Sequence, residues 1–155
     1  MNPNKLNYIC DCVEDAFQKV ANQIAKLQFT RNDQRLTNSD GKKYLVVVGL
    51  LGLNNGRILF EMNEGLVHKL IEGMNGEPLE DDADIYPGLA EFTNMVSGNG
   101  IIAINNHYIG NDLRLMPPAI FIGENLEVIT FKVDSILRSY QTEHGEVQIE
   151  VGFEG

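Results

Sequence analysis

The chain has 155 residues, of which 43% are hydrophobic and 22% charged, and its formal net charge is -10. This length and composition suit one globular domain with its own core and do not indicate a disordered or fibrous protein. The negative charge and the lack of any Lys/Arg cluster disfavour nucleic acid and an anionic membrane surface as partners. No apolar stretch approaches the roughly 18 residues that cross a bilayer, and the first residues do not resemble a signal peptide. We therefore expect a single domain over residues 1–155, located in the cytoplasm.

The first predicted helix has apolar residues at three- and four-residue steps, which is typical of a helix packed on a core. These positions are Leu6, Ile9, Cys10, Val13, Phe17, Val20, Ile24 and Leu27. The only cysteines, Cys10 and Cys12, point about 200° apart on such a helix and cannot form a disulfide with each other. We expect reduced thiols, and two cysteines without a nearby His pair match no zinc site.

The next part of the chain predicts an edge element followed by a buried strand. Residues 29–43 are polar and rich in turn formers, which indicates a short edge strand or a loop. Residues 44–51 are almost entirely apolar, as in a buried strand. Such a strand can belong to the core or to an interface between subunits, and the core is the more common case.

A hairpin and a short helix are expected after this strand. Residues 54–56, Asn-Asn-Gly, tolerate the positive φ angles of a tight turn, so residues 57–62 are predicted to pair back in antiparallel fashion. Asn63 is placed to cap a helix that ends near Gly76. The helix buries apolar positions at helical spacing. They are Leu66, Val67, Leu70, Ile71 and Met74.

A third helix is predicted from about Ile85 to about Ile104, with Pro87 in its first turn. An acidic run precedes this helix and suits the positive end of the helix dipole. The run consists of Glu80, Asp81, Asp82 and Asp84. Carboxylates so close together also have the ligand chemistry of a divalent-metal site, but a solvated run that complements the dipole is the commoner meaning.

The remaining sequence predicts several strands separated by turns. They cover residues 113–116, 119–122, 128–131, 135–140 and 147–151. The last two alternate in polarity and flank Gly145, which predicts a terminal hairpin. Helices and mostly antiparallel strands are mixed without βαβ alternation, so the predicted fold class is α+β, a mostly antiparallel sheet with long helices packed on it.

The third helix has two contrasting faces. Its apolar positions, within about 60° of each other at ~100° per residue, are Ile85, Leu89, Phe92 and Val96. Close together on the opposite side lie Pro87, Glu91, Asn94 and Gly98. Side chains three residues apart, such as Glu91 and Asn94, reach the same point from neighbouring turns. Asn and Gly both lower helix propensity, by up to about 1 kcal/mol for Gly, although an exposed Glu and Asn are also ordinary surface residues.

The stretch Glu-Phe-Thr-Asn-Met-Val-Ser-Gly-Asn at residues 91–99 resembles the Glu-x-x-Asn helix of the CheC/CheX/FliY family of chemotaxis phosphatases. That helix typically continues through an apolar pair into a small residue, Gly and Asn. The resemblance extends to residues 48–50 and 56–60 before the motif and to residues 116–123 after it, and is weakest over residues 29–43.

The number of motif copies separates two types within this family. CheC-like members carry the motif on two helices and CheX-like members on one. Here the first helix has no second copy, because Glu14 is followed three residues later by Phe17, and Lys19 stands three residues before Asn22. The chain therefore resembles the CheX type. It departs from the family in having Pro87 where Asp or Ser is common.

The resemblance implies a phosphatase that hydrolyses the aspartyl phosphate of a CheY-like response regulator. Asn94 would orient the attacking water, and Glu91 would pair with the active-site lysine of the partner. Pro87 and Gly98 would contact the partner, although close helix packing explains Gly98 equally well. No cofactor or metal is expected in this chain, because Mg²⁺ would belong to the partner. CheX-like proteins dimerise through their sheets, which implies a homodimer.

Two other functions remain open from the sequence. A non-catalytic member would only bind a response regulator or a flagellar-switch protein, and the intact pair of Glu91 and Asn94 argues against that. An unrelated hydrolase would need a histidine base. His68, His107 and His144 each lack a nearby Ser or Cys in a recognisable nucleophile motif.

Overall fold

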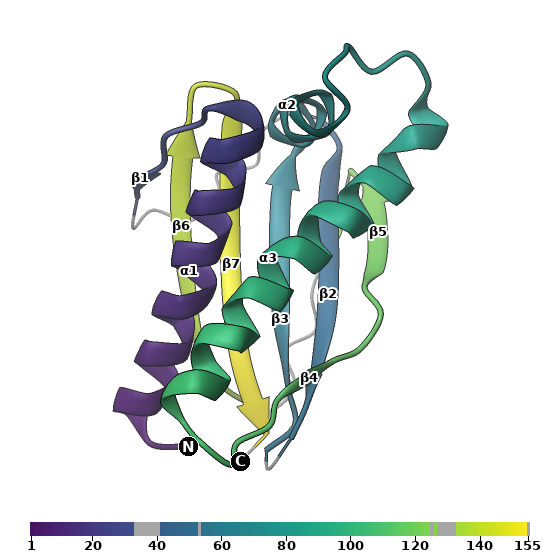
Figure 1. Ribbon diagram of the computed structural model, residues 1–155. Coiled ribbons are helices and arrows are strands. Elements are labelled where there is room, and N and C mark those ends of the chain that lie inside the picture. Colours follow the sequence, from purple (N-terminus) through teal and green to yellow (C-terminus); the bar gives the residue numbers. More distant parts are fainter. Residues whose placement is uncertain (33–40, 53, 125, 127–132, 155) are drawn as a thin grey trace.

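The computed structural model describes residues 1–32, 41–52, 54–124, 126 and 133–154. A seven-stranded sheet carries a layer of helices on one face (Figure 1). Its strand order is β1-β6-β7-β3-β2-β4, with β5 also paired to β2, and the described pairings are antiparallel. The predicted α+β class is confirmed. Within the described ranges, none of the helices has both the length and the apolar character that a bilayer-spanning segment needs.

The elements follow one another in an order close to the predicted one. The helices are α1 (Pro3–Ala25), α2 (Glu64–Asn75) and α3 (Ile85–His107), with a short 3-10 helix η1 (Asp82–Asp84) directly before α3. The strands are β1 (Thr30–Arg31), β2 (Lys43–Leu51), β3 (Gly56–Asn63), β4 (Arg114–Leu115), β5 (Ala119–Gly123), β6 (Val133–Thr142) and β7 (Gly145–Glu154). The predicted strand at residues 128–131 lies outside the described residues.

The core lies between the helices and the sheet. Alternate residues of the three central strands are at most 5% exposed. They are Tyr44, Val46, Val48, Leu50, Ile58, Phe60, Met62, Val147, Ile149, Val151 and Phe153. Phe17 of α1 joins the layers, since its ring lies 5.3 Å from Phe92 of α3 and 5.9 Å from Phe60 of β3. The alternate residues of β2 that face the helices therefore belong to the core, which is the alternative that the sequence favoured.

The first helix forms as predicted and ends at Lys26, whose φ of 53° places it in the left-handed region. Cys10 and Cys12 are free, as expected, and both are buried. Burial raises the pKa of the Cys10 thiol from 9.0 to about 11. The following edge strand, β1, pairs with β6.

The β2–β3 hairpin has the predicted antiparallel pairing, with a register from Lys43 opposite Asn63 to Leu50 opposite Gly56. The expected positive φ angles are wrong, because none of the residues 54–56 adopts one. Gly56 is instead required by a close approach, since a Cβ there would collide with the carbonyl oxygen of Gly152 on β7. The terminal β6–β7 hairpin is confirmed, and Gly145 turns it with a φ of 146°.

Asn63 occupies the N-cap position of α2, but the predicted capping hydrogen bond is wrong. Its Oδ1 accepts a hydrogen bond of 2.7 Å from the backbone N–H of Glu146 on β7. The side chain thus fixes the start of α2 to a distant strand rather than to its own first turn. The helix ends at Gly76 with a φ of 75°, as predicted.

Candidate active site on the third helix

Helix α3 crosses the sheet diagonally, with α1 beside its C-terminal half and α2 near its N-terminal end (Figure 1). Its predicted core face is confirmed. Ile85 is 3% exposed, and Leu89, Phe92 and Val96 are fully buried. On the opposite side Pro87, Glu91 and Asn94 are exposed and Gly98 is half-buried.

The turn that carries the Glu91–Asn94 pair satisfies its own polar groups. Thr93, between the two, is fully buried, and its hydroxyl donates to the carbonyl oxygens of Leu89 at 2.9 Å and Ala90 at 3.2 Å. Thr93 therefore needs no partner from another element.

Three glycines of α3 have different surroundings, which bears on the packing explanation for Gly98. A Cβ at Gly88 would lie 3.1 Å from Ile71 of α2, and one at Gly100 would lie 3.6 Å from Val13 of α1. A Cβ at Gly98 would meet nothing within 4 Å. Close helix packing therefore explains Gly88, and Gly100 also lies against a neighbouring helix, whereas Gly98 leaves open space on the exposed side.

The side chains of Glu91 and Asn94 are available for contacts with another molecule. Both are exposed, and no hydrogen bond or ion pair within the described ranges engages either one. The carboxylate can accept hydrogen bonds and pair with a cation, while the amide can donate and accept at once. Nothing in the part of the chain that the structure describes competes for these groups.

The acidic run before α3 forms η1 and its approach. Asp81 accepts a hydrogen bond of 2.9 Å from the backbone N–H of Ala83, while Asp84 precedes α3 without a side-chain capping bond. The carboxylates lie at the N-terminal end of α3, where they complement the helix dipole. Among the residues that the structure describes, no three His, Cys, Asp or Glu side chains are grouped to hold a metal ion.

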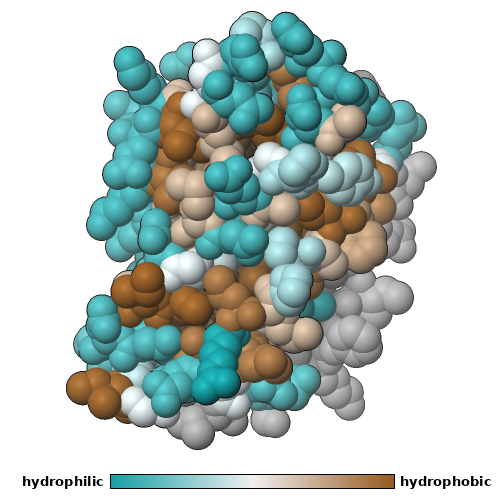
Figure 2. Space-filling model, turned by 45° about the vertical axis from the view of Figure 1, so that its right-hand side comes forward, coloured by the Kyte–Doolittle hydropathy of each residue, from teal (hydrophilic) through white to brown (hydrophobic). Residues whose placement is uncertain are grey.

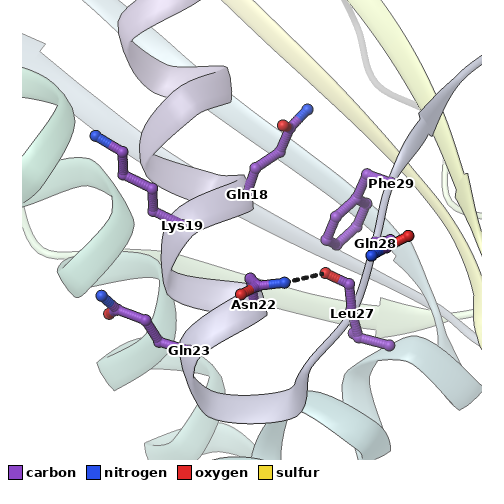
Figure 3. Close-up of a pocket in the computed structure, with 7 residues that line it drawn as sticks. All are labelled: Gln18, Lys19, Asn22, Gln23, Leu27, Gln28 and Phe29. Atoms are coloured by element: carbon purple, nitrogen blue, oxygen red, sulfur yellow. Dashed lines mark hydrogen bonds between the residues drawn. The ribbon is translucent and has the colours of Figure 1, made fainter.

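Two hollows on the described part of the surface lie away from the pair. One of roughly 480 Å³ lies where α1 turns toward β1, and another of roughly 340 Å³ lies beside Leu51 and Arg114. Figure 3 shows the first of these, in which Asn22 donates a 3.4 Å hydrogen bond to the carbonyl oxygen of Leu27, and Lys19 points away from that loop. Its polar groups do not converge on a ligand. Glu91 and Asn94 line neither hollow and stand on a convex helix surface.

Helix α1 offers no second copy of the pair. The Glu14 carboxylate accepts a hydrogen bond of 2.9 Å from Arg138 of β6, and the same guanidinium nitrogen lies 2.7 Å from Asp11. Three residues after Glu14 stands the buried Phe17. The Glu14 carboxylate is thus committed to an ion pair, and no asparagine stands three residues after it.

The histidines do not form an alternative catalytic group. His68 lies 3.6 Å from Glu64 on α2, His107 stacks on Tyr8 with ring centroids 4.1 Å apart, and His144 is exposed in the β6–β7 turn. None of these contacts brings a serine or cysteine to an imidazole nitrogen.

Two exposed apolar residues of α3 were missed by the sequence reasoning. Met95 is 39% exposed and Ile102 is 59% exposed. Both lie beside Glu91 when α3 is projected down its axis. A helical wheel that also asks which apolar residues fall outside the core face would have found them.

Comparison with known proteins assigns the chain to a family. Residues 44–136, more than half of the chain, match the family model described as chemotaxis phosphatase CheX. The chain therefore belongs to the CheX family of chemotaxis phosphatases. A search of curated proteins found no match.

Solved structures of CheX proteins share the fold. The chain is similar to CheX from Vibrio vulnificus (TM-score 0.80, 19% identity, 94% of this chain and 96% of that chain). It is also similar to CheX from Desulfovibrio desulfuricans (TM-score 0.79, 24% identity, 94% and 99%). A third similar structure is CheX in a CheX-CheY-BeF3-Mg²⁺ complex from Borrelia burgdorferi (TM-score 0.73, 18% identity, 94% and 97%). At these identities the likeness establishes the fold.

Proposed function

We propose that this chain hydrolyses the aspartyl phosphate of a CheY-like receiver domain, with Asn94 orienting the attacking water and Glu91 pairing with the active-site lysine of the partner. The observation that carries the proposal is the exposed pair on α3, whose side chains have no partner within the described residues. The family assignment supports the reaction class.

The reaction needs positioning more than covalent help. Water attacks phosphorus, the bond between phosphorus and the aspartate oxygen breaks, and the products are inorganic phosphate and a free carboxylate. An acyl phosphate already has a good leaving group, so the task is to place water in line with it. An amide suits this task, because it donates and accepts hydrogen bonds without changing its protonation state. Glu91 supplies a charge-assisted contact that anchors the docked helix.

The shape of the site favours a protein substrate. A small substrate needs a concave site, whereas Glu91 and Asn94 stand on a convex helix outside the hollows described above. The partner must therefore supply the pocket, together with the phosphorylated aspartate and its Mg²⁺. A relative from Borrelia burgdorferi forms a CheX-CheY-BeF3-Mg²⁺ complex, which supports the choice of a CheY-like partner.

Pro87 and Gly98 are proposed to contact the partner on either side of the pair. Pro87 is exposed one turn before Glu91, and Gly98 offers open space one turn after Asn94. A partner backbone can approach α3 closely at Gly98, because no side chain stands there.

We further propose a cytoplasmic homodimer that associates through the sheet, as the CheX-like character of the chain implies. Large apolar residues are exposed on sheet strands, with Leu51 at 44%, Phe121 at 49% and Leu137 at 41%. Sedimentation equilibrium of the free chain tests this point, and a monomer at micromolar concentration contradicts it.

The function is tested by mixing the chain with a phosphorylated receiver domain from the same organism and following the loss of phosphate. The wild type is expected to accelerate the loss, Asn94→Ala to abolish the acceleration, and Glu91→Ala to weaken it. Asn106→Ala is the matched control, because Asn106 is an exposed amide of the same helix that lies about 18 Å along the axis from Asn94. Binding without accelerated hydrolysis would instead support the scaffold alternative, and no binding to any receiver would refute both.

A further inference from the structure

The exposed side of α3 continues past the Glu91–Asn94 pair as an apolar strip. At ~100° per residue, Glu91, Met95, Gly98 and Ile102 fall within about 60° of the helix circumference. Met95 is 39% exposed and Ile102 is 59% exposed, while Leu89 and Ile104 of the same helix are fully buried. Apolar side chains break the hydrophilic surface on the side of the molecule that carries α3 (Figure 2). We call Met95, Gly98 and Ile102 the α3 strip.

The α3 strip lies in a part of the chain that has no charge. Residues 92–111 contain no Asp, Glu, Lys or Arg, although 22% of the whole chain is charged. A single exposed apolar residue is ordinary, but an exposed helix face is normally rich in charged residues. The centre of a protein–protein interface is typically depleted in charged residues and enriched in Met, and a polar rim surrounds it.

Local stability does not account for the α3 strip. Ile is β-branched and Gly is flexible, and both are poorer helix formers than Ala, by up to about 1 kcal/mol for Gly. Neither residue is required by packing. A Cβ at Gly98 would meet nothing within 4 Å, and the Ile102 side chain is more than half exposed.

The position of the strip indicates what covers it. Ile102 lies eleven residues after Glu91, about 16 Å along the helix axis. A standard interface covers about 800 Å² per partner, so a molecule docked on Glu91 and Asn94 reaches Ile102 as well. An anionic lipid surface is disfavoured by the acidic residues at the N-terminal end of the same helix and by the net charge of -10.

We propose that Met95 and Ile102 form an apolar contact surface for the receiver domain and set the affinity of the docked complex, while Asn94 sets its chemistry. The proposal rests on the function proposed above. It separates the residues of α3 that act on the phosphate from those that select the partner. Receivers share an active site, so discrimination among them falls to such flanking contacts.

The test measures binding and hydrolysis separately. The probe for binding is a receiver domain from the same organism loaded with Mg²⁺ and BeF₃⁻. Met95→Ala and Ile102→Ala are each expected to raise the Kd about tenfold and to leave the hydrolysis rate at saturating concentration unchanged. The Kd increase is expected to be the same at low and high salt, whereas the increase caused by Glu91→Gln shrinks with salt because it is electrostatic.

Ile109→Ala is the matched control for Ile102→Ala, because Ile109 is 94% exposed but lies beyond the end of α3. It is expected to bind as the wild type does. The proposal is wrong if Ile102→Ala and Ile109→Ala weaken binding to the receiver equally. It is also wrong if neither Met95→Ala nor Ile102→Ala weakens binding. If Asn94→Ala still abolishes hydrolysis in that case, the proposed function stands alone.

Two further outcomes also count against the proposal. If Met95→Glu changes the oligomeric state of the free chain, the α3 strip is a self-association surface and not a receiver contact. If the wild type neither binds nor dephosphorylates any receiver, the proposed function and this inference fail together.

Discussion

Helices α1 and α3 each have 23 residues and lie side by side on the sheet, yet their polar residues have different roles. In α1, Asp11 and Glu14 are tied to Arg138 of β6. In α3, Glu91 and Asn94 have no partner within the described residues. The carboxylates of α1 are thus engaged within the domain, whereas the polar pair of α3 is available to another molecule.

The apolar faces of the two helices are by contrast alike. Phe17 of α1 and Phe92 of α3 are both at most 1% exposed, and their rings meet edge to face. Phe92 stands directly after Glu91, so the same turn holds α3 to the core on one side and presents the candidate site on the other. A rigid core contact behind a reactive pair is what positioning chemistry requires.

Substitution of Arg138 should give the largest loss of stability. It should act through the ion pairs with α1 and leave the hydrolysis rate unchanged. Arg138 is 8% exposed and pairs with Glu14, whose side chain is 19% exposed, and with the more exposed Asp11. Arg138→Met leaves these carboxylates without their cation, and because Asp11 is solvated we expect a loss of about 2 to 3 kcal/mol. Urea unfolding measures the loss, with Arg138→Lys as a milder control. A folded Arg138→Met protein with a reduced hydrolysis rate would contradict the claim that α1 serves the fold and α3 serves the reaction.

Part of the pH dependence of stability should originate in α1 and none in the buried face of α3. Burial holds the pKa of Cys10 at about 11, above its ordinary value of 9.0, while the buried face of α3 has no titratable side chain. Because the folded-state pKa is raised, this contribution is complete below pH 9 and is lost as the pH rises toward 11. The free energy of unfolding should therefore fall over that range, and less so in Cys10→Ala. An identical fall in both proteins would contradict this assignment.

Gly98→Ala should give the smallest change in stability, with the opposite sign. A Cβ there meets nothing within 4 Å, so the substitution gains helix propensity of about 0.5 to 1 kcal/mol. Gly88→Ala is the matched comparison, because its Cβ would press on Ile71 at 3.1 Å and should not stabilise. Thermal unfolding compares the two. If Gly98→Ala is stabilised but binds the receiver more weakly, the glycine serves docking, and unchanged binding would remove Gly98 from the contact surface.

The sequence predicted what depends on local spacing. The two faces of α3, the antiparallel pairing of β2 with β3 and the terminal hairpin all follow from periodicity and turn residues. Predictions were wrong where a residue's role depends on a contact with a distant part of the sequence. Asn63 was expected to cap α2, but its side chain bonds the backbone of Glu146. Gly56 was assigned to a turn angle, but it allows the approach of Gly152.

Prediction of the candidate site had the same limit, because contacts with distant parts of the chain do not follow from local spacing. Helical spacing placed Glu91 and Asn94 on one exposed face, and the resemblance gave that face a function. No pattern within α1 shows that Glu14 is taken by Arg138, which lies 124 residues away. The packing alternative for Gly98 was likewise open until the surroundings of three glycines could be compared.

The central claim is that α3 holds the catalytic pair and that α1 does not. The most direct test is a single-turnover measurement with a phosphorylated receiver at saturating concentrations of Asn94→Ala and Asn22→Ala, since each residue is an exposed asparagine on one of the two helices. We expect Asn94→Ala to lower the rate by about 100-fold or more, with little change in Kd, and Asn22→Ala to match the wild type. A wild-type rate for Asn94→Ala, or an equal loss for Asn22→Ala, would contradict the claim.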